Sequence, residues 1–299
     1  MLGPGPLLLR DLVAAGVDGE EVRRMHRRGE LARVGPGAYV DPADPRLQRP
    51  EDRHRLRVAA AAPRMAADAV VSHQSAAVLH RLPVWNLPLA RVHATRSRRS
   101  SGLRTGRLHV HPAPLAADEI DMVDGVAVTV AARTAADIAR TVGFEEAVAV
   151  LDAALRRHLV TLTELAAALD RMAGWPGVPR ARRAVEFADP RSMSVGESRS
   201  RVRMAQHGVA VPVLQWSVVG PGGVVLGTAG FGWPEHGVVG EFDGLVKYGR
   251  RRPPGESPAD AVVAEKRRED RMRTVLRGFV RWAWADLDEF GEVARRLPR

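Results

Sequence analysis

The stretch RDLVAAGVDGEEVRRMHRRGELARVGPGAYV, residues 10–40, predicts two helices followed by a hairpin. Apolar residues recur at helical spacing in the first helix, and Gly16 ends it. Asp18 is a typical N-cap for the second helix, which carries one apolar face. Two short strands then flank a Gly-Pro-Gly turn at 35–37. This order is that of a winged helix-turn-helix, whose second helix enters the major groove of DNA.

Arginines occupy the rest of the second helix, and their planar guanidinium groups suit bidentate contacts with phosphate and guanine. The predicted DNA contacts come from the arginines of this helix and of the hairpin: Arg23, Arg24, Arg27, Arg28 and Arg33. The simpler alternative is a helical hairpin with a solvated basic face. Residues 96–107 hold five arginines and no acid. This segment is either a phosphate clamp, with Arg98 and Arg99 at its centre, or a solvated loop.

Composition narrows the function classes. The chain has 299 residues and a formal net charge of +10, which favours an anionic partner. It contains no cysteine, so disulfides, thiolate metal sites and cysteine nucleophiles are excluded. The N-terminus does not have the pattern of a signal peptide, and no apolar run is of membrane-spanning length. A cytoplasmic protein that does not contact a membrane is expected.

We predict an α/β protein of the α+β multidomain kind. A winged helix at 1–45 is followed by a mixed α/β middle domain at 46–188 and a further α/β domain at 189–299. Three prolines at 41–50 indicate a linker. In the middle domain, Thr134 with Asp137 resembles a capping box at the start of a helix.

The middle domain also carries two histidines, His109 and His111, that alternate in GRLHVHPAP and would share one strand face. A metal pair is conceivable, but the sequence indicates no third ligand, and surface histidines on a strand are the commoner case. The neighbouring residues Ser72 and His73 raise the idea of nucleophilic catalysis. They lack a nucleophile elbow or a clear third member, so a helix start is the better interpretation.

Carboxylates gather in the last domain. The stretch GTAGFGWPEHGVVGEFDG, residues 227–244, predicts two strands joined by a Trp-Pro-Glu turn. Glu241 and Asp243 point to the same face of the second strand. Glu197, on the preceding predicted helix, could reach that face. A metal-dependent phosphodiesterase needs carboxylates that converge in this way.

Together with EKRRED and VRWAWADL, these segments resemble the PD-(D/E)xK nuclease core in the branch of the very-short-patch repair endonucleases, over residues 194–288. The resemblance implies a restriction-endonuclease-like fold with Glu197, Glu241 and Asp243 as catalytic residues and Glu241 and Asp243 as ligands of Mg²⁺. It departs from the family at Gly230, where an aspartate is usual, and Asp243 stands where the motif usually has a lysine, as in the very-short-patch branch. Because glycine offers no ligand, we expect weak metal binding and a degenerate domain.

The opening stretch, residues 10–40, resembles the winged-helix N-terminus of AbiEi-type antitoxins of type IV toxin–antitoxin systems. SHQSAAVLHRLPVW at 72–85 and GVAVTVAARTAADIAR at 125–140 are similar to the module that follows in actinobacterial members. The resemblance covers residues 5–160. It implies binding to inverted repeats near the protein's own promoter and repression of transcription, with double-stranded DNA and a cognate toxin as partners.

The leading expectation is therefore a DNA-binding regulator of the antitoxin type with a degenerate nuclease-like domain and no required cofactor. Two alternatives stay open. One is a metal-dependent DNA endonuclease that uses Mg²⁺. The other is an antitoxin that binds its toxin through the middle domain.

Overall fold

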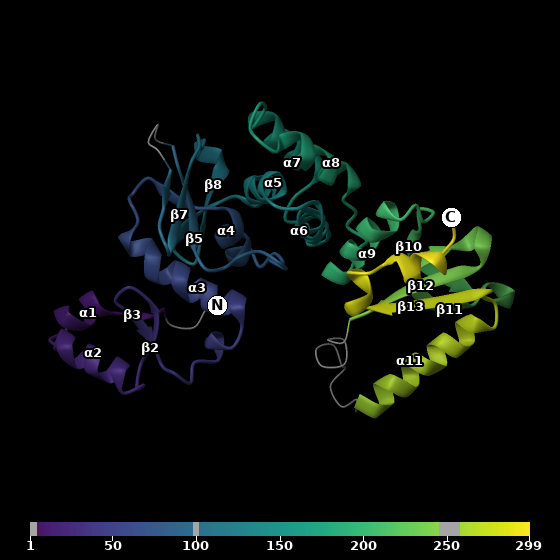
Figure 1. The fold of residues 1–299 in the computed structure, drawn as a ribbon, viewed down its shortest axis with the longest axis horizontal. Coiled ribbons are helices and arrows are strands. Elements are labelled where there is room, and N and C mark those ends of the chain that lie inside the picture. Colours follow the sequence, from purple (N-terminus) through teal and green to yellow (C-terminus); the bar gives the residue numbers. More distant parts are fainter. Residues whose placement is uncertain (1–4, 98–101, 245–257) are drawn as a thin grey trace. The chain divides into compact units, whose positions relative to one another are not determined.

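A computed structural model describes residues 5–97, 102–244 and 258–299 of the chain (Figure 1). The chain divides into two compact units. One contains residues 1–154 and 158–187, and the other contains residues 155–157 and 188–299. Helices and sheets occur in both, which confirms the predicted α/β class. None of the helices in the described ranges is long and apolar enough to cross a membrane.

The first unit begins with a small helix and hairpin assembly. Its elements are β1 (Leu7–Leu8), α1 (Leu9–Ala14), α2 (Gly19–Arg27), β2 (Ala32–Gly35) and β3 (Ala38–Val40). The strands form an antiparallel sheet in the order β1-β3-β2. Asp18 caps α2 by accepting a hydrogen bond from the backbone N–H of Glu20, at 3.0 Å. Gly37 turns the hairpin with a φ of 59°, in the left-handed region that favours glycine.

A six-stranded mixed sheet with helices completes the first unit. Its elements are α3 (Pro50–Ala61), β4 (Ala69–Val71), α4 (His73–Leu79), β5 (Val92–Arg96), β6 (Leu103–Arg104), β7 (Leu108–Pro112), β8 (Ile120–Val123), β9 (Val126–Thr129), α5 (Ala131–Thr141), α6 (Phe144–Arg156), α7 (Leu162–Arg171) and α8 (Val178–Phe187). The strand order is β6-β7-β5-β4-β9-β8. Strands β5 and β7 are parallel, as are β4 and β9. Val58 of α3 and Leu79 of α4 pack on Val71 and Val92 of the sheet.

One prediction in this region is wrong. Thr134 and Asp137 do not begin a helix, because α5 already starts at Ala131. Both side chains lie inside the helix and are fully buried. The polar pair that resembles a capping box belongs instead to an interior hydrogen-bond network.

The second unit contains a four-stranded sheet between helices. Its elements are α9 (Val195–Gln206), β10 (Val213–Val219), β11 (Val225–Trp233), β12 (Val238–Asp243), α11 (Pro258–Arg273), β13 (Gly278–Ala283) and α12 (Gly291–Arg295). Three strands form the predicted meander, and β13 joins β12 in parallel. Met272 of α11 packs on one face against Ala229 and Val239. Phe231 and Trp282 form the core of the other face, with Phe290 beyond the sheet.

Short 3-10 turns connect several of these elements: η1 (Pro45–Leu47), η2 (Ala62–Arg64), η3 (Ala117–Glu119), η4 (Pro221–Gly223), η5 (Pro234–His236) and η6 (Ala285–Leu287).

Candidate nucleic-acid interface

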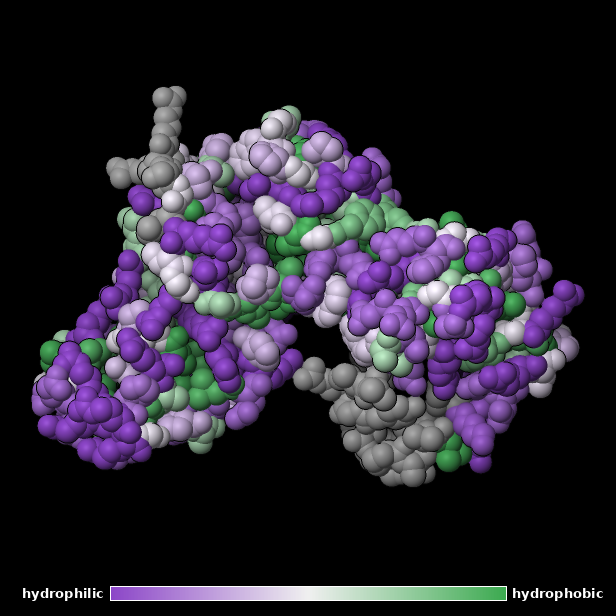
Figure 2. Space-filling view, viewed as in Figure 1, coloured by the Kyte–Doolittle hydropathy of each residue, from purple (hydrophilic) through white to green (hydrophobic). Residues whose placement is uncertain are grey.

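The α2 helix is fixed to its hairpin through one apolar face. Val22 is 1% exposed and packs with Leu31 and Tyr39. His26 adds a polar contact, since its Nδ1 lies 2.8 Å from the carbonyl oxygen of Leu31 and its ring lies against Tyr39. With this face buried, the opposite face of α2 is held toward solvent on a rigid support. Figure 2 shows that the surface over α2 is almost wholly hydrophilic.

The predicted arginines lie on that exposed surface. Arg23, Arg24, Arg27 and Arg28 are all exposed on α2 or at its C-cap, and Arg33 is exposed on β2. Three of the helix arginines form ion pairs with nearby acids. Arg23 pairs with Glu20, and Arg24 pairs with Glu21 at 2.7 Å. Arg28 reaches two carboxylates: Glu30 at 2.6 Å and Glu21 at 3.0 Å.

Because of these pairs, the α2 segment does not have the positive charge that its arginines alone predict. Four arginines of the α2 segment stand against four acids, Asp18, Glu20, Glu21 and Glu30, so their formal charges cancel (+4 − 4 = 0). The hydrogen bond with Arg28 is the main cause that lowers the pKa of Glu21, and the one with Glu30 is the main cause that raises the pKa of Arg28. Because these pairs are exposed to water, they are weak and screened by salt, and a phosphate can replace the carboxylates.

Two of the predicted arginines are not engaged in this way. Within the ranges that the structure describes, neither Arg27 nor Arg33 forms an ion pair with a carboxylate. Arg33 donates from Nε to the carbonyl oxygen of Gly35 at 3.1 Å. Arg27 and Arg33 therefore offer guanidinium groups to an anion without first breaking an ion pair. Arg98 and Arg99 lie outside the described residues.

The predicted carboxylate site of the second unit has a different arrangement from the one expected. Glu197 is buried at the first turn of α9, where its Oε2 accepts hydrogen bonds from the backbone N–H of Met193 at 2.9 Å and from Nε2 of Gln215 at 3.1 Å. Gly230 faces this side chain, because a Cβ added there would lie 3.9 Å from the carboxyl carbon of Glu197. Gly230, where the nuclease resemblance implies an aspartate, therefore lies next to Glu197.

Glu241 is held by arginines instead of lying free for a cation. Its Oε1 accepts from Nη2 of Arg268 at 2.6 Å, and its Oε2 lies 3.2 Å from Nη2 of Arg281. Asp243, at the end of β12, is half-buried. The structure does not bring Glu197, Glu241 and Asp243 together as one ligand group: among the described residues, the group of three whose ligand atoms lie within 4.8 Å of one another consists of histidines in the first unit.

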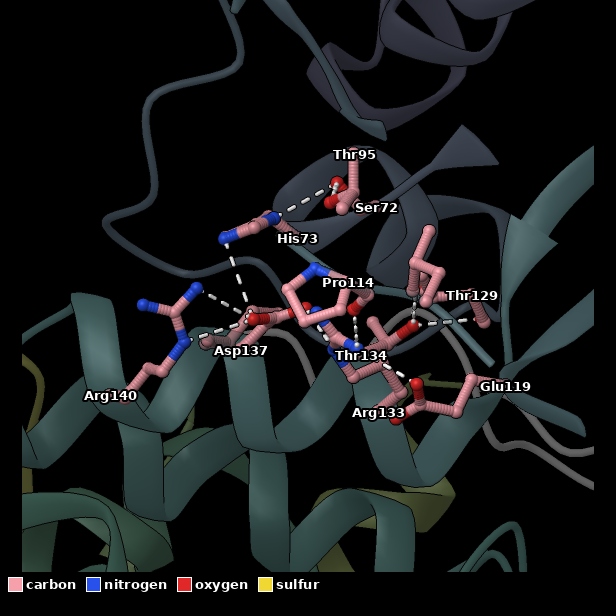
Figure 3. A network of polar contacts seen from close by, with 12 residues as sticks. Ser72, His73, Thr95, Pro114, Glu119, Thr129, Arg133, Thr134, Asp137 and Arg140 are labelled. Atoms are coloured by element: carbon pink, nitrogen blue, oxygen red, sulfur yellow. Dashed lines mark hydrogen bonds and ion pairs between the residues drawn. The ribbon is translucent and has the colours of Figure 1, made fainter. Parts of the chain in front are cut away.

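A buried polar network lies in the first unit, and sequence reasoning did not find it (Figure 3). Arg133 of α5 is 2% exposed and donates from Nε to Asp137 at 2.8 Å and from Nη1 to Glu119 at 3.1 Å. Arg140 also binds Asp137, at 2.8 Å. An arginine and an aspartate four residues apart on a helix are the signal that could have indicated the pair.

Ser72, His73 and Asp137 follow one another in the same network, in the order of a hydrolase triad. Ser72 Oγ lies 2.9 Å from His73 Nδ1, and His73 Nε2 lies 3.8 Å from Asp137. Ser72 is fully buried, however, and its Oγ accepts a hydrogen bond from Thr95 at 2.8 Å. A nucleophile must be reachable by its substrate, so these contacts fit a structural role, in agreement with the predicted helix start at this point.

Comparisons with known proteins point to the N-terminal segment. Residues 2–40 match a family profile described as "Transcriptional regulator, AbiEi antitoxin". The chain is also similar to two uncharacterized proteins of Mycobacterium tuberculosis, MT2308 of strain CDC 1551 / Oshkosh and Rv2248 of strain ATCC 25618 / H37Rv. The identity to each is 34% over 126 residues, which is 42% of this chain and 46% of the relative. The match thus spans about half the length of these curated relatives.

Proposed function

We propose that this protein is a DNA-binding transcriptional regulator of the antitoxin type and that residues 5–40 are its winged helix. The observation that carries the proposal is the match of residues 2–40 to the AbiEi regulator family, on a segment whose described part forms two helices and a hairpin. The apolar face of α2 is buried on the hairpin, and its arginines face solvent. In a winged helix this is the orientation in which the second helix contacts DNA.

In this proposal the arginines divide into two groups. Arg27 of α2 and Arg33 of the hairpin meet phosphates directly. Arg23, Arg24 and Arg28 exchange their carboxylate partners for phosphates as the helix approaches DNA. Once the arginines contact phosphate, the carboxylates of the α2 segment repel DNA that binds in a wrong position. They therefore limit nonspecific binding and favour a defined register.

The direct experiment measures binding of the full chain to DNA from upstream of its own coding sequence, by fluorescence anisotropy over a range of salt concentrations. Arg24→Ala combined with Arg28→Ala should weaken binding roughly tenfold or more and reduce the salt slope by about two, because each phosphate contact releases counterions. The matched control is Arg171→Ala with Arg182→Ala, which removes two exposed, ion-paired arginines from the helices of the same unit. Equal binding by the two double variants would overturn the proposal.

A second proposal concerns the second unit: it is a nuclease-shaped domain that has lost its chemistry. Two observations support it. Gly230, the position at which the nuclease resemblance implies a ligand carboxylate, lies beside Glu197, and Glu241 forms ion pairs with Arg268 and Arg281. A hard cation needs carboxylate oxygens that are not already engaged by arginine.

The test is DNA cleavage with Mg²⁺ or Mn²⁺. The unmodified protein should not cut, and Gly230→Asp should raise affinity for the metal, whereas Gly230→Ala should not. A Cβ at this position meets no atom closer than 3.9 Å, so the alanine variant has room for its methyl group. Robust cleavage by the unmodified protein that Glu241→Ala abolishes would replace this proposal with the endonuclease alternative.

A further inference from the structure

Three histidines meet on two neighbouring strands of the six-stranded sheet. In the parallel pair of β5 and β7, His93 lies opposite His109 and Thr95 lies opposite His111. Paired residues, and residues two apart on a strand, point to the same face of a sheet, so the three imidazoles share one face. One ring nitrogen from each residue lies within 4.8 Å of the others. The sequence shows the His109 and His111 pair, and the strand pairing supplies the third ligand.

The spacing is close to what a tetrahedral ion requires. Zinc binds imidazole nitrogen at about 2.0–2.1 Å, which places two ligand nitrogens about 3.3 Å apart in a tetrahedral site. Nδ1 of His93 and Nε2 of His111 are 3.0 Å apart. The rings of His109 and His111 lie 3.9 Å apart between centroids. A small adjustment of the three rings would bring their ligand nitrogens to the spacing that the ion requires.

Neighbouring residues contact His93 and His111, and one side of the histidine cluster is accessible to solvent. The backbone N–H of His93 donates to Ser75 Oγ at 2.8 Å, and the ring of His73 stacks on His111 at 3.7 Å. His93 is buried, whereas His109 and His111 are half-buried, so one side of the cluster opens to solvent. Three imidazole ligands with one open side are typical of a three-histidine metal site that keeps a position for water.

We propose that His93, His109 and His111 form a binding site for a divalent first-row transition metal of the Zn²⁺ class. Imidazole ligands suit Zn²⁺, Ni²⁺ and Cu²⁺ and do not suit Mg²⁺ or Ca²⁺, which prefer oxygen. The site is separate from the DNA-binding proposal, because its residues lie on β5 and β7 and not in residues 5–40.

The experiment titrates Zn²⁺ into the full chain after removal of metal with a chelator, by isothermal calorimetry. We expect one saturable Zn²⁺ site per chain and no comparable site for Mg²⁺. His109→Gln should weaken Zn²⁺ binding by roughly tenfold or more, because it removes one ligand from the ion. His236→Gln, at an exposed histidine of the η5 turn, is the matched control and should bind as the unmodified protein does.

Co²⁺ absorption on the unmodified chain gives a second measurement that does not depend on any variant folding. A site with three imidazoles should give the strong visible bands of a tetrahedral ion. The bands should be lost in His109→Gln and retained in His236→Gln. No saturable Zn²⁺ binding, weak octahedral Co²⁺ bands on the unmodified chain, or equal binding by the two variants would each overturn the proposal.

Discussion

Arginine–carboxylate pairs occur in two settings in the first unit, on the surface of α2 and inside the sheet-and-helix core. The side chain of Arg24 is 51% exposed and that of Glu21 is 39% exposed. Arg133 and Asp137 form a pair of nearly the same length, 2.8 Å, with side chains that are 2% and 0% exposed. Length is therefore not what distinguishes the two pairs. Access to water decides whether a pair can be exchanged for another partner.

The physical reason lies in solvation. When an exposed pair separates, water replaces each partner, so the exchange for a phosphate costs little. When a buried pair loses one member, the other charge stays in a medium that cannot solvate it. The α2 arginines can therefore exchange their carboxylates for a ligand, whereas Arg133 keeps its buried partners and stabilises the fold.

Removal of Arg133 should produce the largest effect. Arg133→Ala leaves the buried carboxylates of Asp137 and Glu119 without this partner and should lower the free energy of unfolding by about 3–5 kcal/mol. Urea denaturation followed by circular dichroism measures the change. Arg171→Ala removes an arginine from an exposed pair with Asp118 and should have little effect. An equal loss of unfolding free energy in both variants would mean that burial does not decide how strongly such an ion pair stabilises the fold.

Acid should destabilise the core through His54. Burial lowers the pKa of His54 to about 4 from an ordinary value of 6.5, so the unfolded chain binds a proton between these values and the folded chain does not. Stability should fall as pH drops from 6.5 to 4, by up to about 1.4 kcal/mol per pH unit and about 3 kcal/mol in total for this group. In the fold His54 contacts the carbonyl oxygen of Leu89 and Ser75 Oγ at 2.9 and 2.8 Å.

Urea midpoints measured between pH 4 and 7 check this prediction. His54→Gln should flatten the pH dependence relative to the unmodified protein, because glutamine does not titrate. His236→Gln, which changes an exposed histidine, should leave the dependence as it is. An identical pH profile for the two variants would mean that His54 is not the group that resists protonation.

A single α2 arginine should affect DNA and not stability. Arg27→Ala should weaken DNA binding several-fold and lower the salt slope by about one, because no carboxylate among the described residues has to leave Arg27 before it meets a phosphate. Anisotropy titrations at several salt concentrations measure both quantities, and thermal unfolding should be unchanged. Arg182→Ala serves as the control. An Arg27→Ala protein with the DNA affinity of the control would remove Arg27 from the interface.

Sequence reasoning located the elements that rest on local signals. The N-cap at Asp18, the Gly-Pro-Gly hairpin and the meander at 213–243 all follow from neighbouring residues, and the structure confirms these elements. The same reasoning predicts that the α2 arginines lie on the surface but takes no account of Glu20, Glu21 and Glu30, which form ion pairs with three of them. Counting one sign of charge along a helix misses partners of the opposite sign on the same face.

Contacts between residues far apart in the sequence cannot be predicted from local sequence patterns. His93 joins His109 and His111 only because β5 and β7 pair in parallel, and strand pairing across the sheet cannot be deduced from periodicity. The bond between Arg133 and Glu119 likewise depends on where α5 packs. The sequence pattern places Asp137 at a helix start instead of inside α5, because a capping box and an interior ion pair use the same residue types at similar spacing.

If α2 is a DNA-binding surface whose ion pairs are exchanged for phosphate contacts, the exchange should be visible in the DNA affinity of Glu21→Gln at low salt. Glu21 holds both Arg24 and Arg28, and glutamine keeps its size while removing its charge. Asp170→Asn, which removes the acid from the exposed pair with Arg182, is the control for net charge. We expect Glu21→Gln to bind the protein's upstream DNA roughly threefold or more tightly than the control, and this difference should shrink as salt screens the charges. Affinity equal to or below that of the control, with α2 still folded, would contradict it.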